Sequence, residues 1–182
     1  MIHCPVPEVG YVDVPQALLA IEPRLAHMTA GSSHGSVWIP DCSESAGLQY
    51  FSDSENRVRF ARLAVLYGLV TASDHQFIYK KASPNLVFSV DHGNFFPNGG
   101  DWQVAHIQNA PPAAPDNNIV VGCQLTQAEI DDARSTLRGI TEGQIAEAVS
   151  GPMDHWGVSI DEKIAVAIFL DMRRQELLVG LP

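Results

Sequence analysis

Apolar residues occupy nearly every helical face between Ser54 and Ala72. This pattern is typical of a helix that is buried on all sides. Asp53 and Glu55 place negative charge at the start of the segment, where it favours the positive end of the helix dipole. We therefore predict a central buried helix whose far end delivers the chain to Asp74.

The C-terminal third combines helical periodicity with repeated capping patterns. In each pattern a hydroxyl residue is followed three positions later by Glu or Gln, so that both side chains satisfy unpaired backbone groups at a helix start. The longest predicted helix runs from about Ile160 to Leu178 and carries Ile164, Ile168 and Met172 at helical spacing. We predict three C-terminal helices, which follow Thr126, Thr141 and Ser159.

Two short apolar runs on either side of a turn-forming stretch predict a β-hairpin. Its strands are residues 77–79 and 86–90, and its turn is residues 80–85. The two strands of a hairpin are antiparallel, and the hairpin is flanked by Asp74 and Asp91. The predicted hairpin therefore brings both carboxylates to one end.

The remaining segments are shorter and richer in proline or glycine. Residues 1–13 alternate proline with valine and predict an extended, hinge-like segment, and a short helix is predicted over residues 15–21. Residues 31–36 predict a flexible loop, and residues 109–118 an irregular loop rich in Pro and Asn. We expect one α+β domain over residues 1–182, mostly helical, in which a small β-hairpin carries the site.

The composition argues against nucleic-acid and membrane partners. With 21 acidic and 11 basic residues and a net charge of −10, the chain offers no obvious basic surface for polyanions. Cys4, Cys42 and Cys123 cannot all pair within the chain and lack metal-ligand spacing. The first residues lack the features of a signal peptide, and the apolar run 60–72 is too short to span a membrane. We expect a cytoplasmic location with reduced thiols.

An Asp-His pair stands at each end of the predicted hairpin: Asp74-His75 and Asp91-His92, with Gly93 after the second pair. Phosphoryl-transfer enzymes of the protein-kinase type place one aspartate beside the attacking hydroxyl. A second aspartate, followed closely by glycine, holds the metal on the nucleotide phosphates. Asp74 and Asp91 fit these two roles in their order and spacing.

Four blocks of sequence carry a family resemblance. The two specific blocks are residues 74–79 (Asp-His-Gln-Phe-Ile-Tyr) and 89–100 (Ser-Val-Asp-His-Gly-Asn-Phe-Phe-Pro-Asn-Gly-Gly). Two further blocks are residues 31–36 (Gly-Ser-Ser-His-Gly-Ser) and 56–60 (Asn-Arg-Val-Arg-Phe). From about Val6 into its second half, the chain resembles the HipA-like kinase domain family, which is distantly related to the HipA toxin kinases and to phosphatidylinositol kinases.

The resemblance implies a protein-kinase-like C-terminal lobe with little or no N-terminal sheet lobe. In such a lobe Asp74 is the catalytic-loop aspartate, with His75 beside it. Asp91 is the metal-binding aspartate, Gln76 a further metal and cofactor ligand, and Gly93 part of the nucleotide site. The implied cofactors are ATP and Mg²⁺, and the implied partners are this nucleotide and a phosphoacceptor, either a protein or a small molecule.

Two departures from the kinase pattern lead to a second interpretation. The metal-binding asparagine expected five positions after the catalytic aspartate is replaced by Tyr79, and residues 1–79 contain no lysine to clamp the phosphates. Arg24, the backbone amides of residues 31–36 or another polypeptide would have to supply this clamp. The alternative is a non-catalytic pseudokinase lobe that serves as a binding or scaffold module, as a homo-oligomer or with a separate N-lobe partner.

A third interpretation is a metal-dependent hydrolase or oxygenase that uses both Asp-His pairs. Two carboxylates and two imidazoles form a common donor set for zinc or iron. Adjacent residues of a regular strand point to opposite faces. Each pair can therefore offer both of its side chains to one ion only if it lies in a loop.

Overall fold

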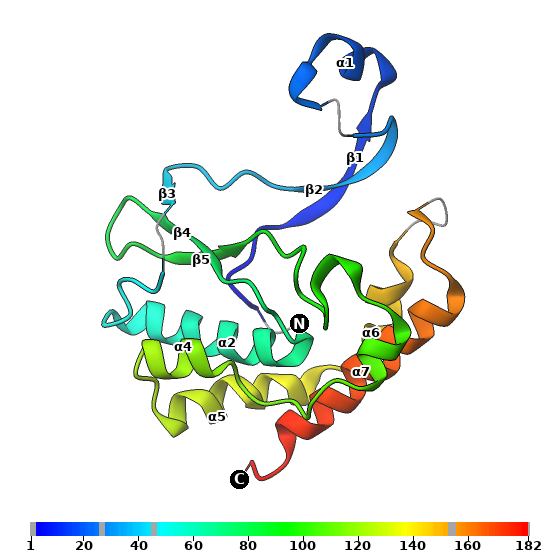
Figure 1. Cartoon of the computed structure of the whole chain (residues 1–182). Coiled ribbons are helices and arrows are strands. Elements are labelled where there is room, and N and C mark those ends of the chain that lie inside the picture. The colour runs from blue at the N-terminus through cyan, green and yellow to red at the C-terminus, as the bar shows by residue number, and fades with distance from the viewer. Residues whose placement is uncertain (1–2, 26–27, 45–46, 153–155, 182) are drawn as a thin grey trace.

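The computed structural model describes residues 3–25, 28–44, 47–152 and 156–181. Helices predominate over strands, so the predicted α+β, mostly helical class is confirmed (Figure 1). None of the helices in these ranges is both long and apolar enough to cross a membrane. The strands are β1 (Val9–Val14), β2 (Gly31–Ser36), β3 (Cys42–Glu44), β4 (Gln76–Lys80) and β5 (Val87–Val90). The α-helices are α1 (Gln16–Ile21), α2 (Ser54–Val70), α3 (Val104–Gln108), α4 (Asn117–Gly122), α5 (Gln127–Ser135), α6 (Glu142–Ser150) and α7 (Ile160–Leu178).

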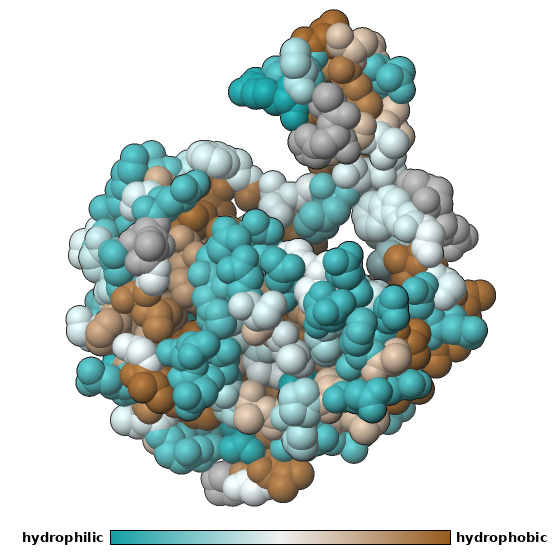
Figure 2. Space-filling view, viewed as in Figure 1, coloured by the Kyte–Doolittle hydropathy of each residue, from teal (hydrophilic) through white to brown (hydrophobic). Residues whose placement is uncertain are grey.

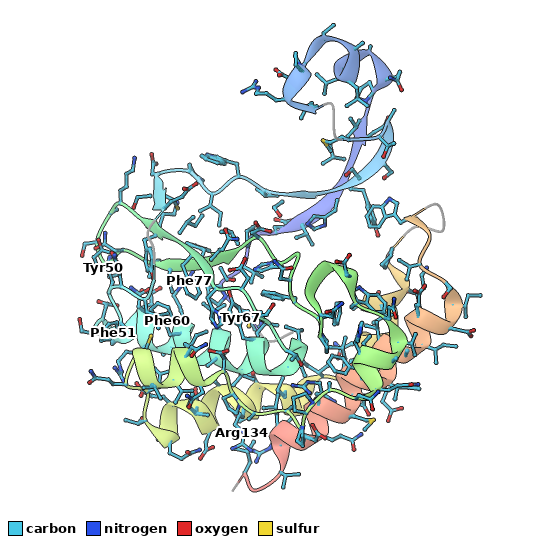
Figure 3. All side chains as sticks on the ribbon, viewed as in Figure 1. Tyr50, Phe51, Phe60, Tyr67, Phe77 and Arg134 are labelled. Carbon is cyan, nitrogen blue, oxygen red and sulfur yellow. The ribbon has the colours of Figure 1, made fainter. Side chains whose placement is uncertain are left out.

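Helix α2 is the centre of the body and confirms the predicted buried helix. Asp53 caps its first turn by accepting hydrogen bonds from the backbone N–H groups of Glu55 and Asn56, at 2.9 and 3.4 Å. Phe60 is fully buried and meets Phe77 of β4 edge to face, with ring centroids 5.9 Å apart (Figure 3). Helices α4, α5 and α7 also pack on α2. The helix is therefore enclosed between the hairpin and other helices.

The predicted hairpin is confirmed as the antiparallel strands β4 and β5, and β3 joins the outer edge of β4. Gln76 pairs with Val90 in the register, so the start of β4 lies beside the end of β5. Phe77 and Tyr79 are buried whereas Gln76 is exposed, as expected from the alternation of a strand. The hairpin thus buries one face against α2 and opens one end to solvent.

Two buried polar side chains fasten the body to α2. Asn56 is fully buried: its Oδ1 accepts from the Val87 N–H at 2.9 Å, and its Nδ2 lies 3.2 Å from carbonyl oxygens in the loop before α2 and in the hairpin turn. Arg173 of α7, 5% exposed, donates to three backbone carbonyls, two of them in the last turn of α2. There the guanidinium meets the negative end of the helix dipole. The acceptors are Gly68 (2.6 Å), Leu69 (2.8 Å) and Pro111 (2.5 Å).

The three predicted C-terminal helices are confirmed as α5, α6 and α7. Each begins with a capping box of the predicted residues: Thr126 with Glu129, Thr141 with Gln144, and Ser159 with Glu162. The cap of α5 is also tied to α2, because Arg57 donates to both carboxylate oxygens of Glu129 at 2.5 and 2.7 Å. The irregular loop ends two residues earlier than predicted, because Asp116 caps α4 by accepting from the Ile119 N–H at 2.9 Å.

Strands β1 and β2 form a separate antiparallel ribbon that carries α1 at its tip and stands away from the body (Figure 1, Figure 2). The predicted extended segment of residues 1–13 ends in β1, and residues 1–2 lie outside the described ranges. The predicted loop of residues 31–36 is wrong, because this stretch pairs with β1 along its whole length. Its glycines and serines indicate a loop, whereas pairing with β1 makes it a strand. Tyr11 packs edge to face on Trp156, 5.6 Å away, and so anchors the ribbon.

Candidate functional site

The chain leaves α2 in a tight turn that leads to Asp74. Thr71 takes a left-handed conformation (φ 63°), and the Ala72 N–H closes the turn on a carbonyl of the last helical turn at 3.0 Å. Ser73 then ties this loop to the loop after β5. Its N–H and its hydroxyl both donate to the Asn94 carbonyl, at 3.2 and 3.3 Å. The two loops that carry the aspartates are therefore held together by the backbone as well as by the hairpin.

Asp91 follows β5 directly and turns the chain out of the strand. Its φ is 54°, in the left-handed region that aspartate tolerates better than most residues. Glycine is the residue that most readily takes a positive φ, but here the positive φ belongs to Asp91 and not to the nearby Gly93. A Cβ added at Gly93 would meet Asp91 Oδ1 at 3.7 Å, which is an ordinary contact. The turn therefore does not require a glycine.

The structure brings Asp74, Gln76 and Asp91 together at the open end of the hairpin. The Gln76 side-chain nitrogen donates to Asp74 Oδ2 at 2.9 Å and to Asp91 Oδ2 at 3.1 Å. The two carboxylate oxygens are therefore separated by no more than the sum of these two distances. Gln76 and Asp91 are exposed and Asp74 is half-buried, so the cluster faces solvent. We call Asp74, Gln76 and Asp91 the carboxylate cluster.

Hydrogen bonds hold the carboxylate of Asp74 in its ionised form. The amide of Gln76 is the main cause of a lowered pKa at Asp74, and the His75 backbone and the Asn94 side chain add to the effect. Gly99 leaves the room that the Asn94 side chain occupies. A Cβ at Gly99 would lie 2.6 Å from Asn94 Oδ1, and Gly99 has a positive φ of 62°. Asn94 thus supports the cluster.

His75 points away from the carboxylate cluster. Its Nε2 lies 3.1 Å from Asp116 Oδ2, although the two groups are not aligned for a hydrogen bond. Its ring packs on Tyr67 at 5.0 Å and on Phe77 at 6.5 Å. Asp116 also caps α4. His75 therefore connects the loop of Asp74 to α2 and α4, and it lines the cavity next to Gln76 without contacting the carboxylate cluster.

His92 likewise points inward. Its Nε2 lies 2.9 Å from Ser89 Oγ, which shares a 2.6 Å hydrogen bond with Tyr67, and its ring packs on Phe95 at 4.3 Å. Burial lowers the pKa of His92; the nearby Asp91 opposes this shift, and His34 of β2 adds to it. Burial also raises the pKa of Tyr67 to about 12. This inner chain of polar groups was not predicted, because neither Ser89 nor Tyr67 stands out in an apolar stretch of sequence.

Tyr79 occupies the position where the kinase pattern has a metal-binding asparagine. The residue is fully buried; its hydroxyl donates to the Gly47 carbonyl at 2.9 Å, and its ring packs on Tyr50 at 5.4 Å. It lies on the core face of β4, whereas Gln76 begins the same strand on the exposed side. Gln76 is therefore the β4 residue that reaches both aspartates.

The two expected sources of a phosphate clamp both lie on the ribbon, and Arg24 has another partner. Arg24 pairs with Glu22 at 2.8 Å in the turn that follows α1, on the ribbon. The backbone of β2 pairs with β1. A cavity of about 350 Å³ is lined by Gln76, His75 and Glu44 among others, whereas Asp74 and Asp91 are not among its lining residues. Space for a ligand is therefore present beside Gln76, whereas Arg24 is engaged with Glu22 on the ribbon.

The donor set of the cluster suits a hard divalent cation. Magnesium binds carboxylate and amide oxygens and keeps sites for water and phosphate. The Gln76 side-chain nitrogen lies between the carboxylates of Asp74 and Asp91. A cation at this position would balance the two negative charges. Rotation of the Gln76 amide group would then turn its oxygen, rather than its nitrogen, toward the cation. In the described part of the chain, no three His, Cys, Asp or Glu side chains are grouped to hold a metal. A zinc or iron site would need both imidazoles to turn toward the aspartates, whereas His75 lies beside Asp116 and His92 lies beside Ser89.

Comparison of the chain with protein-family models, with curated proteins and with solved structures finds no match.

Proposed function

We propose that the carboxylate cluster is the magnesium-nucleotide site of a kinase-type phosphotransferase. The observation that carries the proposal is the convergence of Asp74 and Asp91 on the single amide of Gln76. The two aspartates come from different loops: Asp74 lies two residues before β4, and Asp91 directly follows β5. Kinase-type chemistry needs this arrangement of one aspartate at the acceptor hydroxyl and one at the metal.

Each residue of the cluster has a distinct role in this proposal. Asp74 accepts a hydrogen bond from the acceptor hydroxyl and orients it, a role that suits its lowered pKa because the carboxylate stays ionised. Asp91 and Gln76 hold the metal, and Asn94 keeps Asp74 in position. The bound magnesium would neutralise the charge of the nucleotide phosphates. His75 and His92 support the loops from behind.

A binding module without turnover is the second candidate. It is favoured by Arg24, an expected phosphate clamp whose guanidinium pairs with Glu22 on the ribbon. In this version the cluster binds magnesium and nucleotide, while transfer requires a basic group from another polypeptide. The two candidates agree on binding and differ on turnover.

Calorimetric titration of ATP, with and without magnesium, tests the proposal. Asp91→Asn is the informative variant, because asparagine keeps the shape of the side chain and tolerates the left-handed backbone. Asp101→Asn is the matched control, because it removes one exposed negative charge from the neighbouring turn outside the cluster. We expect magnesium-dependent binding in the wild type and in Asp101→Asn, and its loss in Asp91→Asn.

Two outcomes distinguish the candidates. Magnesium-dependent binding combined with release of phosphate or labelling of an added acceptor supports the phosphotransferase, and the same binding without either supports the binding module. Absence of binding in the wild type, or equal binding in Asp91→Asn, would overturn both.

A further inference from the structure

Another cavity lies between the N-terminal segment and helices α2, α6 and α7. Its volume is about 440 Å³, within the range of pockets that hold small molecules. Apolar side chains from each of these elements make up most of its lining, among them Val6, Leu66, Leu69, Ile145 and Leu170. No residue of the carboxylate cluster is among the described lining residues, so this cavity is separate from the candidate site.

Hydrogen bonds fix the N-terminal wall of the cavity to the body. The Cys4 thiol donates to the Arg62 carbonyl at 3.5 Å, and Arg62 Nη1 donates to the His3 carbonyl at 3.3 Å. The Ser89 N–H of β5 donates to the Pro5 carbonyl at 2.8 Å. Burial raises the pKa of Cys4 to about 12, so its thiol lines the cavity as an uncharged group. The cavity is therefore a formed feature of the fold.

The polar side chains of the lining are donors. Among the described residues they are His3, Gln144 and Arg174, and each can donate a hydrogen bond. The Gln144 oxygen accepts from the N–H and the hydroxyl of Thr141 in the cap of α6, at 2.9 and 3.3 Å, which leaves its amino group for a ligand. No acidic side chain is among the described lining residues. The lining therefore favours a ligand whose polar end accepts hydrogen bonds.

Arg174 is the cation of this cavity, and its side chain is only 15% exposed. Its Nε and Nη2 both donate to a single oxygen of Asp171, at 2.9 and 2.7 Å, and the other oxygen of Asp171 accepts from Gln175 at 2.6 Å. Within the described part of the chain, Arg174 Nη1 has no hydrogen-bond partner. A charged group that lies mostly out of water is stabilised when its donors are paired. A carboxylate at Nη1 would supply that pairing.

We propose that this cavity binds a carboxylic acid with an aliphatic chain, of the size of a medium-chain fatty acid. The carboxylate accepts hydrogen bonds from Arg174 Nη1, and the chain lies against the apolar side chains of α2, α6 and α7. The net charge of −10 acts against any anion, so the affinity must come from these local contacts. Both the head group and the chain can therefore be tested by substitution.

Calorimetric titration of the full chain with octanoate, decanoate and decanol, up to about 1 mM ligand, is the test. We expect a single decanoate to bind each chain. Each methylene group that enters the cavity should lower the dissociation constant about fourfold, so decanoate should bind about 15-fold more tightly than octanoate. Decanol has the same chain without the charge and should bind at least about tenfold more weakly than decanoate.

Two variants separate recognition of the head group from recognition of the chain. Arg174→Met should weaken decanoate binding at least about tenfold and leave decanol binding unchanged. Its control is Arg24→Met, because Arg24 also pairs with one nearby acid, Glu22, but lies on the ribbon. Ala148→Trp should fill the cavity from α6 and weaken the binding of both ligands at least about tenfold. Its control is Ala146→Trp, which is also exposed on α6 but does not line the cavity.

Circular dichroism should show the same fold in all four variants, because none of the substituted side chains belongs to the buried core. Absence of decanoate binding in the wild type would overturn the proposal. So would binding that survives Ala148→Trp, because the ligand would then lie elsewhere, or equal binding of decanol and decanoate, because the cavity would then not select a carboxylate. None of these outcomes depends on magnesium or nucleotide, so this test and that of the carboxylate cluster can fail independently.

Discussion

The polar side chains of the carboxylate cluster and those buried in the body differ in exposure and in the partners that they bind. Asn56 and Arg173 lie inside the body, where backbone groups satisfy their donors and acceptors. Asp74 and Asp91 stand at the surface as like charges joined by the Gln76 amide. A buried polar group must be paired, or its desolvation costs stability, whereas exposed charges contribute little. The inner groups therefore hold the fold, and the outer groups are available to a ligand.

The same division runs through each Asp-His pair. The aspartates turn outward to the cluster, and the histidines turn inward, His75 toward Asp116 and His92 toward Ser89. Two residues that are adjacent in sequence can thus have different roles, because one side chain faces solvent and the next faces the interior. Substitutions of inner groups should change stability, and substitutions of outer groups should change binding.

Arg173→Met should have the largest effect, because it removes a buried charged group that serves three backbone carbonyls. Three carbonyl oxygens lose their shared donor, and we expect the free energy of unfolding in urea to fall by about 3 kcal/mol. The control is Arg174→Met, which removes a local pair with Asp171 and should cost less than about 1 kcal/mol. Similar losses in both variants would contradict the role assigned to Arg173.

Asn56→Ala should weaken the link between α2 and the hairpin. The Val87 N–H loses its acceptor, and the carbonyls around Nδ2 lose their donor. We expect a loss of about 2 kcal/mol in the free energy of unfolding, whereas the exposed Asn118→Ala should stay within about 0.5 kcal/mol of the wild type. A loss below that of the control would show that the hairpin does not depend on Asn56.

The Arg57–Glu129 pair should make stability depend on acid pH. The hydrogen-bonded guanidinium of Arg57 lowers the pKa of Glu129 from 4.5 to about 2. Because the folded pKa is the lower one, the contribution is complete above pH 4.5 and is lost as the pH falls through about 2. Glu129→Gln should cost about 1 to 2 kcal/mol at neutral pH and progressively less as the pH approaches 2. Denaturation across this pH range measures the difference, and a pH-independent gap would disagree with the assignment.

Asp91→Asn should have the smallest effect on stability. It removes one of two like charges at an exposed position and keeps a residue that tolerates a positive φ. We expect the free energy of unfolding to change by no more than about 0.5 kcal/mol, as for other exposed substitutions. A loss of about 2 kcal/mol or more in urea denaturation would place Asp91 with the inner, structural groups instead.

The sequence predicts those parts of the fold that local rules determine. The buried helix, the hairpin and three capping boxes follow from residues that act on their near neighbours, and all are confirmed. Residues 31–36 form a strand because of β1, a partner remote in sequence that their glycines and serines do not reveal. The positive φ at Asp91 is likewise not evident from the sequence, because glycine is the usual residue with a positive φ and Gly93 stands two positions later.

In the site, too, the features that depend on local sequence could be predicted, and those that depend on distant residues could not. The convergence of Asp74 and Asp91 was predictable, because the register of one hairpin determines it. The inward direction of His75 and His92 was not, because it depends on Asp116, Ser89 and Tyr67, which only the packed structure brings within reach.

The most direct test of the carboxylate cluster as a ligand site is the change in melting temperature caused by ATP and magnesium together. A ligand that binds only the folded state raises this temperature by an amount that grows with the logarithm of the ligand concentration divided by its dissociation constant. We predict a rise of a few degrees in the wild type and none in Asp91→Asn, although the two proteins melt at nearly the same temperature without ligand. The same rise in both proteins, or no rise in either, would contradict the proposal that this cluster binds the nucleotide.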